Sequence, residues 1–130
     1  MSYLLVSPHV NLYSFTGEYS HNDTEELHEM NKKRFGKSWY WYDNPVGYSY
    51  NELGYRMKEL TDVDYDNYFA FFGCSFTVGT GLPLEETFAY KIAKEFDVDY
   101  VNGAVGGGSP DFAIYNAITL LSNAPKKPKA

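Results

Sequence analysis

The second half of the chain alternates short apolar runs with helical patterns, and this order constrains the fold more than any other feature. Residues 68–72 (Tyr-Phe-Ala-Phe-Phe) are almost continuously apolar, as in a strand buried on both faces of a parallel sheet. Apolar side chains then recur every fourth position over residues 84–96, which predicts an amphipathic helix. Residues 98–101 predict a second strand. Residues 109–111 (Ser-Pro-Asp) are typical of a helix start, and we expect this helix to reach about Leu121.

The order strand, helix, strand, helix predicts an α/β fold whose parallel strands are joined by right-handed crossovers. In such sheets ligands bind at the carboxyl ends of the strands. Two glycine-rich turns, around residues 73–81 and 103–108, directly follow the predicted strands. The sequence therefore places its candidate site at that edge of the sheet.

The composition changes near residue 67, from a segment rich in Tyr, Asn and Glu to one that is apolar and glycine-punctuated. We therefore expect a Tyr-rich N-terminal extension over residues 1–66 and an α/β unit over residues 67–130. Within the extension, residues 23–35 predict a surface helix capped by Asn22 or Asp23 and stopped by Gly36.

The aromatic residues of the extension also favour short extended segments. Residues 38–42 (Ser-Trp-Tyr-Trp-Tyr) and 48–50 have strand propensity and flank a turn at residues 43–45, which suggests a weak hairpin. The 13 tyrosines of the chain suit either a sticky surface for sugars and partner proteins or the filling of a core, and we favour the core.

Charge and cysteine content exclude several classes of protein. A net charge of −6 without a basic stripe disfavours binding of a nucleic-acid backbone. Cys74 is the one cysteine, so neither an intrachain disulfide nor a multi-cysteine metal site can form. His9, His21 and His28 lack the HxxxH or HxH spacing of a zinc site, and we expect them on the surface without a metal.

The first residues are too short an apolar run for a signal peptide or a membrane span, and they lack a basic segment. We therefore expect a cytoplasmic protein without membrane association. A virus-encoded protein packaged from the cell interior fits the same pattern.

Ser75 is the candidate nucleophile, because it leaves a buried strand at the sheet's carboxyl edge. Gly73 before it and Gly79 after it allow a sharp turn and a close approach of substrate. A serine needs a base to take its proton, and the oxyanion that forms needs donors, which a glycine turn can provide as backbone amides. From spacing alone, a tight strand-to-helix turn without chemistry explains the pattern equally well.

Three stretches resemble the SGNH (GDSL-like) hydrolase family. Residues 72–79 (Phe-Gly-Cys-Ser-Phe-Thr-Val-Gly) are similar to its first block, and residues 101–107 (Val-Asn-Gly-Ala-Val-Gly-Gly) to its second. Upstream, residues 51–56 (Asn-Glu-Leu-Gly-Tyr-Arg) are similar to a stretch that precedes the first block in many members. The resemblance implies a flavodoxin-like parallel sheet sandwiched by helices, of which residues 67–130 would be the first βαβα half.

The resemblance also implies the roles of individual residues. Ser75 would be the nucleophile and its own amide one oxyanion donor, and Gly107 would give the second donor. Cys74 stands where the family usually has Asp, and we interpret it as a small buried filler. The residues expected to support the two loops are Gly73, Cys74, Thr77, Gly79 and Asn102. No metal and no cofactor are implied.

Two parts of the family pattern have no counterpart here: the third-block Asn and the final Asp-x-x-His that holds the acid and the base. Residues 127–130 resemble the approach to a further strand, which suggests a truncated copy. The function implied is hydrolysis of O-acyl esters of small molecules, such as acetylated carbohydrates or lipids. This activity would be nearly absent from the chain alone, because triad members act as a unit.

Two other interpretations remain open. The chain could be a non-catalytic binding module or a virion-associated structural module on the same fold. It could also be a nucleotide-binding half-domain that uses residues 103–108, although Val105 breaks the Gly-x-Gly-x-x-Gly pattern.

Overall fold

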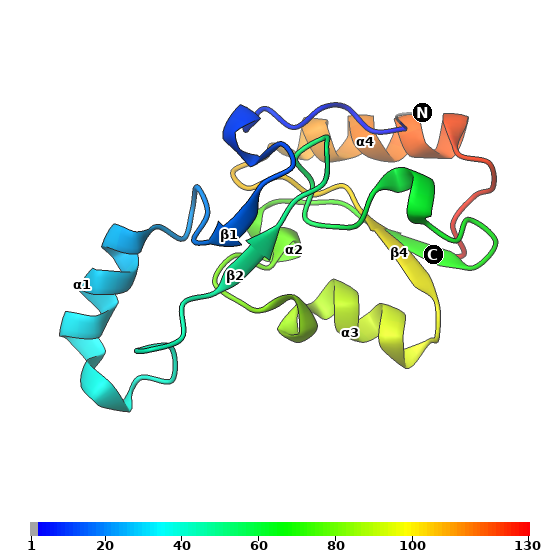
Figure 1. Cartoon of the computed structure of the whole chain (residues 1–130). Helices are drawn as coiled ribbons and strands as arrows, with labels where there is room; N and C mark the ends of the chain where they lie inside the picture. The colour runs from blue at the N-terminus through cyan, green and yellow to red at the C-terminus, as the bar shows by residue number, and fades with distance from the viewer. Residues whose placement is uncertain (1–2) are drawn as a thin grey trace.

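The computed structural model describes residues 3–130 and has a mixed α/β architecture (Figure 1). An antiparallel pair, β1 (Thr16–Glu18) with β2 (Gly47–Ser49), belongs to the first half of the chain. A parallel pair, β3 (Tyr68–Phe71) with β4 (Asp99–Asn102), belongs to the second half. The predicted order of strand, helix, strand and helix is confirmed.

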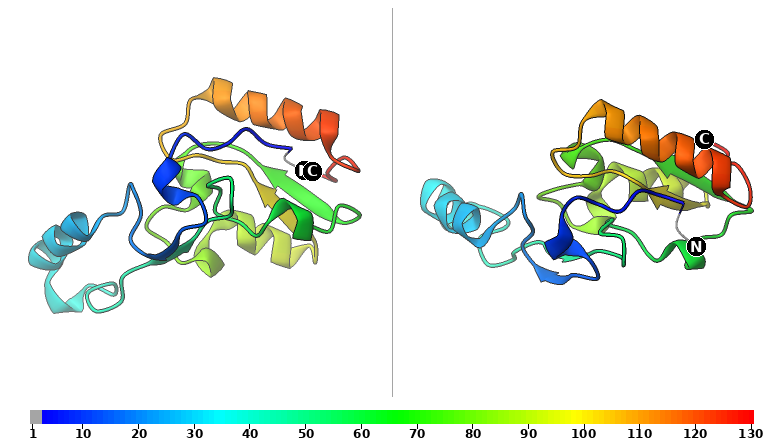
Figure 2. Two further views of the ribbon diagram at one scale, coloured as in Figure 1. Left: turned by 45° about the horizontal axis from the view of Figure 1, so that its top comes forward. Right: turned by 90° about the horizontal axis from the view of Figure 1, so that it is seen from above.

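Two helices enclose the parallel pair. α3 (Phe88–Glu95) lies on one side of β3 and β4, and α4 (Pro110–Asn123) lies on the other, as both Figure 1 and Figure 2 show. Ser109 caps α4 as predicted, since its side chain accepts a hydrogen bond from the backbone N–H of Phe112. A helix thus covers each face of the parallel pair, although Phe69, Ala70 and Phe71 of β3 remain half-buried.

The last two residues lie along the edge of β3 that β4 leaves open. The carbonyls of Asn67 and Phe71 accept hydrogen bonds from the β4 side of the ladder. Backbone groups of Tyr68 and Ala70 face the opposite way: Tyr68 O accepts from Lys129 N at 2.9 Å, and Ala70 N donates to Ala130 O at 2.9 Å. The spatial order is therefore β4, β3, C-terminal residues. β3, the first strand of residues 67–130, lies in the middle.

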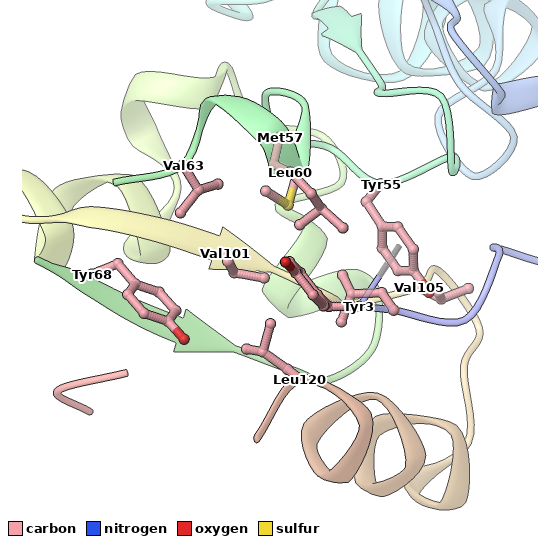
Figure 3. Close-up of a cluster of buried hydrophobic side chains, with 10 residues drawn as sticks. Tyr3, Tyr55, Met57, Leu60, Val63, Tyr68, Val101, Val105 and Leu120 are labelled. Atoms are coloured by element: carbon pink, nitrogen blue, oxygen red, sulfur yellow. The ribbon is translucent and has the colours of Figure 1, made fainter. Parts of the chain in front are cut away.

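One hydrophobic cluster contains residues from both sides of the composition change at residue 67 (Figure 3). Tyr3 and Tyr55 come from the first part of the chain, and Val101 and Leu120 come from β4 and α4. The interpretation that tyrosines fill the core holds for several of them. The buried tyrosines are Tyr3, Tyr48, Tyr50, Tyr55 and Tyr68.

The helix α1 (Glu25–Phe35) ends at Gly36 as predicted, but its cap is neither Asn22 nor Asp23. Thr24 caps it, and its hydroxyl oxygen accepts from Leu27 N at 3.2 Å. Asp23 is engaged elsewhere, because its backbone pairs with Ser20 and its carboxylate accepts from the Tyr48 hydroxyl at 2.7 Å.

The strand expected over residues 38–42 is wrong. This segment consists of a short 3-10 helix, Gly36–Ser38, and turns in which Trp39 N and Tyr42 N donate to Gly36 O and Trp39 O. The Trp39 ring packs against His28 and Phe35 of α1, so aromatic burial rather than sheet pairing fixes the segment. Consequently β2 pairs with the distant β1 and not with residues 38–42.

The helix expected over residues 84–96 is shorter, and its buried face is different. A 3-10 turn, Leu84–Glu86, precedes α3, which Thr87 caps. Ala89 and Ala93 are the buried residues of α3, whereas Phe88, Ile92 and Phe96 are 45%, 37% and 64% exposed. Small residues let the helix lie close to the sheet, and the large apolar stripe lies to one side, where Phe88 and Phe96 contact Phe71 and Phe69.

None of the helices in residues 3–130 combines the length and the apolar character that crossing a membrane requires.

Candidate active site

The turn after β3 presents Ser75 at the carboxyl end of that strand. Ser75 is the first residue of the short helix α2 (Ser75–Val78) and is partly exposed. The N–H groups of Thr77 and Val78 close the turn onto Cys74 O at 2.9 and 3.0 Å. The helix ends at Gly79 in the left-handed region with φ of 76°.

Steric contacts explain two of the glycines in this turn. A Cβ at Gly73 would lie 2.4 Å from Thr77 Oγ1, and one at Gly79 would lie 2.2 Å from Thr87 Cγ2. Neither distance is tolerable without a shift of the neighbouring element. Thr77 therefore packs against the glycine that precedes the nucleophile position, and this fixes the curvature of the turn.

The glycine turn after β4 lies beside the Ser75 turn and is hydrogen-bonded to it. Val105 N donates to Gly73 O at 3.1 Å. The buried Asn102 donates through Nδ2 to Thr77 O at 2.9 Å, and its Oδ1 accepts from Ala104 N at 3.2 Å. Asn102 thus joins the two turns that sequence analysis assigned to one edge of the sheet.

Gly107 is exposed at the tip of the second turn with φ of 70°. A Cβ there would meet no described atom within 4 Å, so the position borders open space. Ser75 and Gly107 share no direct hydrogen bond within residues 3–130; the contacts between their turns run through Gly73, Thr77, Asn102 and Val105.

Arg56, the last residue of the stretch at residues 51–56, bonds to the end of the short helix that begins at Ser75. The buried Arg56 donates from one terminal nitrogen to Gly79 O at 2.7 Å and Val78 O at 3.3 Å. Its other terminal nitrogen donates to Leu82 O at 2.8 Å and Gly47 O at 3.2 Å. The guanidinium also lies over the Tyr48 ring, 4.3 Å from its centroid. These hydrogen bonds engage both terminal nitrogens of Arg56 with backbone carbonyls.

The expectation that the three histidines lie on the surface is wrong for His28, which is buried, with Nε2 3.3 Å from Tyr42 O. His9 and His21 are half-buried beside the second turn. His9 Nε2 lies 2.7 Å from Gly106 O, and the two imidazole rings meet edge to face, with centroids 3.8 Å apart. Burial lowers the pKa of His21, and the neighbouring His9 lowers it further.

Asn116 is a site-supporting residue that the sequence patterns did not reveal. It is fully buried on α4, where Nδ2 donates to Gly103 O at 3.0 Å and to the Tyr55 hydroxyl at 2.8 Å. Its Oδ1 accepts from Leu5 N at 2.9 Å. The available signal was an amide in the middle of a largely apolar helix.

A groove of about 880 Å³ lies away from both turns. It runs between the β1–β2 pair and the amino end of β4, and its lining includes Tyr48, Tyr100 and the Lys58–Asp99 ion pair. Burial raises the pKa of Tyr100 to about 12, so its hydroxyl is protonated at neutral pH. No residue of 73–79 or 103–108 lines it, which separates this groove from the Ser75 edge.

No protein-family model, curated protein or solved structure matches this chain. Function is therefore inferred from the two turns, their contacts and the chemistry that their residues can perform.

Proposed function

We propose that the chain is the N-terminal part of an SGNH/GDSL-like serine esterase that hydrolyses O-acyl esters of small molecules or carbohydrates. Ser75 is the nucleophile, and the amides of Ser75 and Gly107 are the oxyanion donors. The observation that carries the proposal is the hydrogen bond from Val105 N to Gly73 O, because it fastens the serine turn to the glycine turn. Two turns joined in this way can present their backbone amides to one bound group, and donors held in place stabilise developing charge without reorganisation.

The reaction follows from these positions. Ser75 Oγ attacks the ester carbonyl while a base takes its proton, and the amides of Ser75 and Gly107 bind the resulting oxyanion. Collapse of the tetrahedral intermediate breaks the bond to the alcohol, which leaves with a proton, and water then hydrolyses the acyl-serine. No histidine follows Ser75 in the 130 residues, so the proposal assigns the base and its orienting acid to residues outside them.

The flavodoxin-like form of the sheet is part of the same proposal. The order β4, β3, C-terminal residues, with α3 and α4 on opposite sides, supports it, because a doubly wound sheet grows outward in both directions from its first strand.

A fluorophosphonate probe tests the assignment of Ser75. We expect mass spectrometry to find the label on Ser75 at a rate at least about tenfold above that of the exposed Ser122 on α4, since oxyanion donors alone leave measurable catalysis without the triad. Ser75→Ala should abolish that labelling, and Ser122→Ala is the matched control that should not change it. Equal labelling of the two serines in the folded protein would refute the proposal.

The groove beside β2 and β4 favours a second candidate, a non-catalytic binding module on the same fold. Its volume of about 880 Å³ and its two tyrosines suit a small ligand remote from Ser75. A ligand bound there would keep its affinity in Ser75→Ala, as measured by calorimetry, whereas a substrate bound over Ser75 would lose the contact with its hydroxyl.

A further inference from the structure

The N-terminal segment passes beside the turn between β4 and α4, and His9 bonds to the backbone of that turn (Figures 1 and 2). His9 Nε2 lies 2.7 Å from Gly106 O. A carbonyl oxygen can only accept, so Nε2 must carry the hydrogen, and neutral His9 is the Nε2–H tautomer.

This contact acts on one peptide unit. The carbonyl of Gly106 and the N–H of Gly107 belong to the same planar trans peptide, so fixing the oxygen also fixes the direction of the N–H. That N–H points away from the carbonyl, and hence away from His9. A donor at the carbonyl also polarises the unit and strengthens its N–H as a donor.

The turn needs such an anchor. Residues 106–108 are three consecutive glycines, the residue type with the greatest backbone freedom. Gly107 borders open space, so no packing against its α-carbon restricts it. The backbone bond from Gly108 N to Val105 O at 2.9 Å closes the turn around this peptide, and His9 adds a side-chain hydrogen bond to its carbonyl.

His9 is itself held in place. Its ring meets the His21 ring edge to face, and His21 Nε2 lies 2.8 Å from Asn22 Oδ1. Asn22 also covers Gly106, where a Cβ would lie 2.4 Å from Asn22 Nδ2. The second turn thus rests on a small polar cluster of the N-terminal extension.

We propose that His9 is a positioning residue of the oxyanion hole, which orients the Gly106–Gly107 peptide so that the Gly107 amide faces the substrate oxygen. This inference rests on the proposed function, since the oxyanion role of Gly107 belongs to it. It gives the N-terminal extension a part in the chemistry of the Ser75 edge.

Two matched variants test the role of the His9 donor. His9→Gln keeps an N–H donor at a similar reach, whereas His9→Phe keeps a ring against His21 and removes the donor. We expect His9→Phe to shift the ¹³C resonance of the Gly106 carbonyl and the ¹⁵N resonance of the Gly107 amide, with Gly17 unchanged as an internal reference. His9→Gln should restore both resonances toward the wild-type values.

The fluorophosphonate rate at Ser75 gives the functional readout. We expect His9→Phe to slow labelling about tenfold, less than the roughly hundredfold or greater loss when an oxyanion donor is removed outright. His9→Gln should recover most of the rate, and His21→Phe, which retains the His9 donor, controls for packing of the ring pair.

The outcomes separate the two proposals. If the wild-type chain labels Ser75 selectively but His9→Phe changes neither the glycine resonances nor the rate, the positioning role is wrong and the proposed function stands. If Ser75 is never labelled selectively, the proposed function fails, and the oxyanion role of His9 fails with it, whatever the resonances show.

Discussion

At the scale of single residues, Asn116 does more for the edge of the sheet than its position in an apolar helix suggests. Its amide connects three separate parts of the chain: Leu5, the Tyr55 hydroxyl and the Gly103 carbonyl at the start of the glycine turn. Burial raises the pKa of Tyr55 to about 12, so its hydroxyl remains protonated and donates to Leu5 O. All donors and acceptors of this buried group are thereby matched.

Asn116→Leu tests this network, because leucine has a similar volume and no polar atoms. The variant leaves the buried Gly103 O without its partner and also removes the partly buried bond to Leu5 N. An unsatisfied buried group costs about 1–3 kcal/mol and a lost partly buried bond about 1 kcal/mol, so we expect a loss of roughly 2–4 kcal/mol in the free energy of unfolding. Urea denaturation measures it. Asn123→Leu, at the exposed end of the same helix, should stay within about 0.5 kcal/mol of wild type. Equal midpoints for the two variants would contradict the assignment.

Whether a residue of the candidate site could be predicted depends on how far along the sequence its hydrogen-bond partner lies. Ser75 and the glycine turn could be predicted, because each follows directly from a strand and parallel strands end at one edge. The contacts of His9 with Gly106 and of Asn116 with Leu5 could not, since 97 and 111 residues separate the partners. No local pattern encodes such a pairing, and a half-buried histidine has the same sequence context as an exposed one.

At the scale of elements, the α3 helix shows a second limit of pattern analysis. Its apolar residues recur at helical spacing, yet Ala89 and Ala93 are the buried ones. Phe88 and Phe96 stay largely exposed although their rings contact Phe71 and Phe69 of β3. The apolar periodicity predicts that a helix forms. The face that it buries is the one whose small side chains let the helix axis lie close to the sheet. The β1–β2 pairing was missed for a related reason, because two three-residue strands carry too little periodicity to reveal their partner.

The planar guanidinium of Arg56, with its two terminal nitrogens, holds the loop that connects α2 with α3. Four carbonyls from three segments accept hydrogen bonds from its two terminal nitrogens. A planar fork can satisfy them together, whereas the single ammonium of lysine has three donors that diverge from one point. Arg56 therefore joins Gly47 of β2 to the segment that follows Ser75.

Arg56→Lys should release part of that loop. We expect the free energy of unfolding to fall by about 1.5–3 kcal/mol, the range for a hydrogen bond to a charged group, as measured by urea denaturation. Arg34→Lys on the exposed face of α1 is the matched control and should leave the unfolding midpoint unchanged. If Arg56→Lys and Arg34→Lys unfold at the same urea concentration, the planar guanidinium of Arg56 is not needed for stability.

At the scale of the whole molecule, the parallel pair is the part on which both candidate turns depend. A two-stranded sheet has two open edges, and different groups bond to the outward backbone atoms of each edge here. Along β4, the Asp99 carboxylate and the Met57 sulfur accept from the outward N–H groups of Tyr100 and Asn102. Along β3, Lys129 N donates to Tyr68 O and Ala70 N donates to Ala130 O, although residues 129–130 form no strand. Backbone groups of the C-terminal residues thus cover the β3 edge, whereas groups from Asp99 and Met57 cover the β4 edge.

Hydrogen exchange at Ala70 distinguishes strand pairing from mere proximity of the C-terminal residues. Ala70 N donates to Ala130 O at 2.9 Å, so removal of residues 127–130 should speed exchange of this amide roughly tenfold, the factor that corresponds to about 1–1.5 kcal/mol for one hydrogen bond. Gly103 N, which donates to Phe71 O on the β4 side, should keep its protection. Lys129→Ala removes the contact between Lys129 Nζ and Asn67 but leaves the backbone in place, so it should not change exchange at Ala70. If Lys129→Ala speeds exchange as much as the deletion does, the lysine side chain holds the segment, and the order β4, β3, C-terminal residues no longer supports a doubly wound sheet.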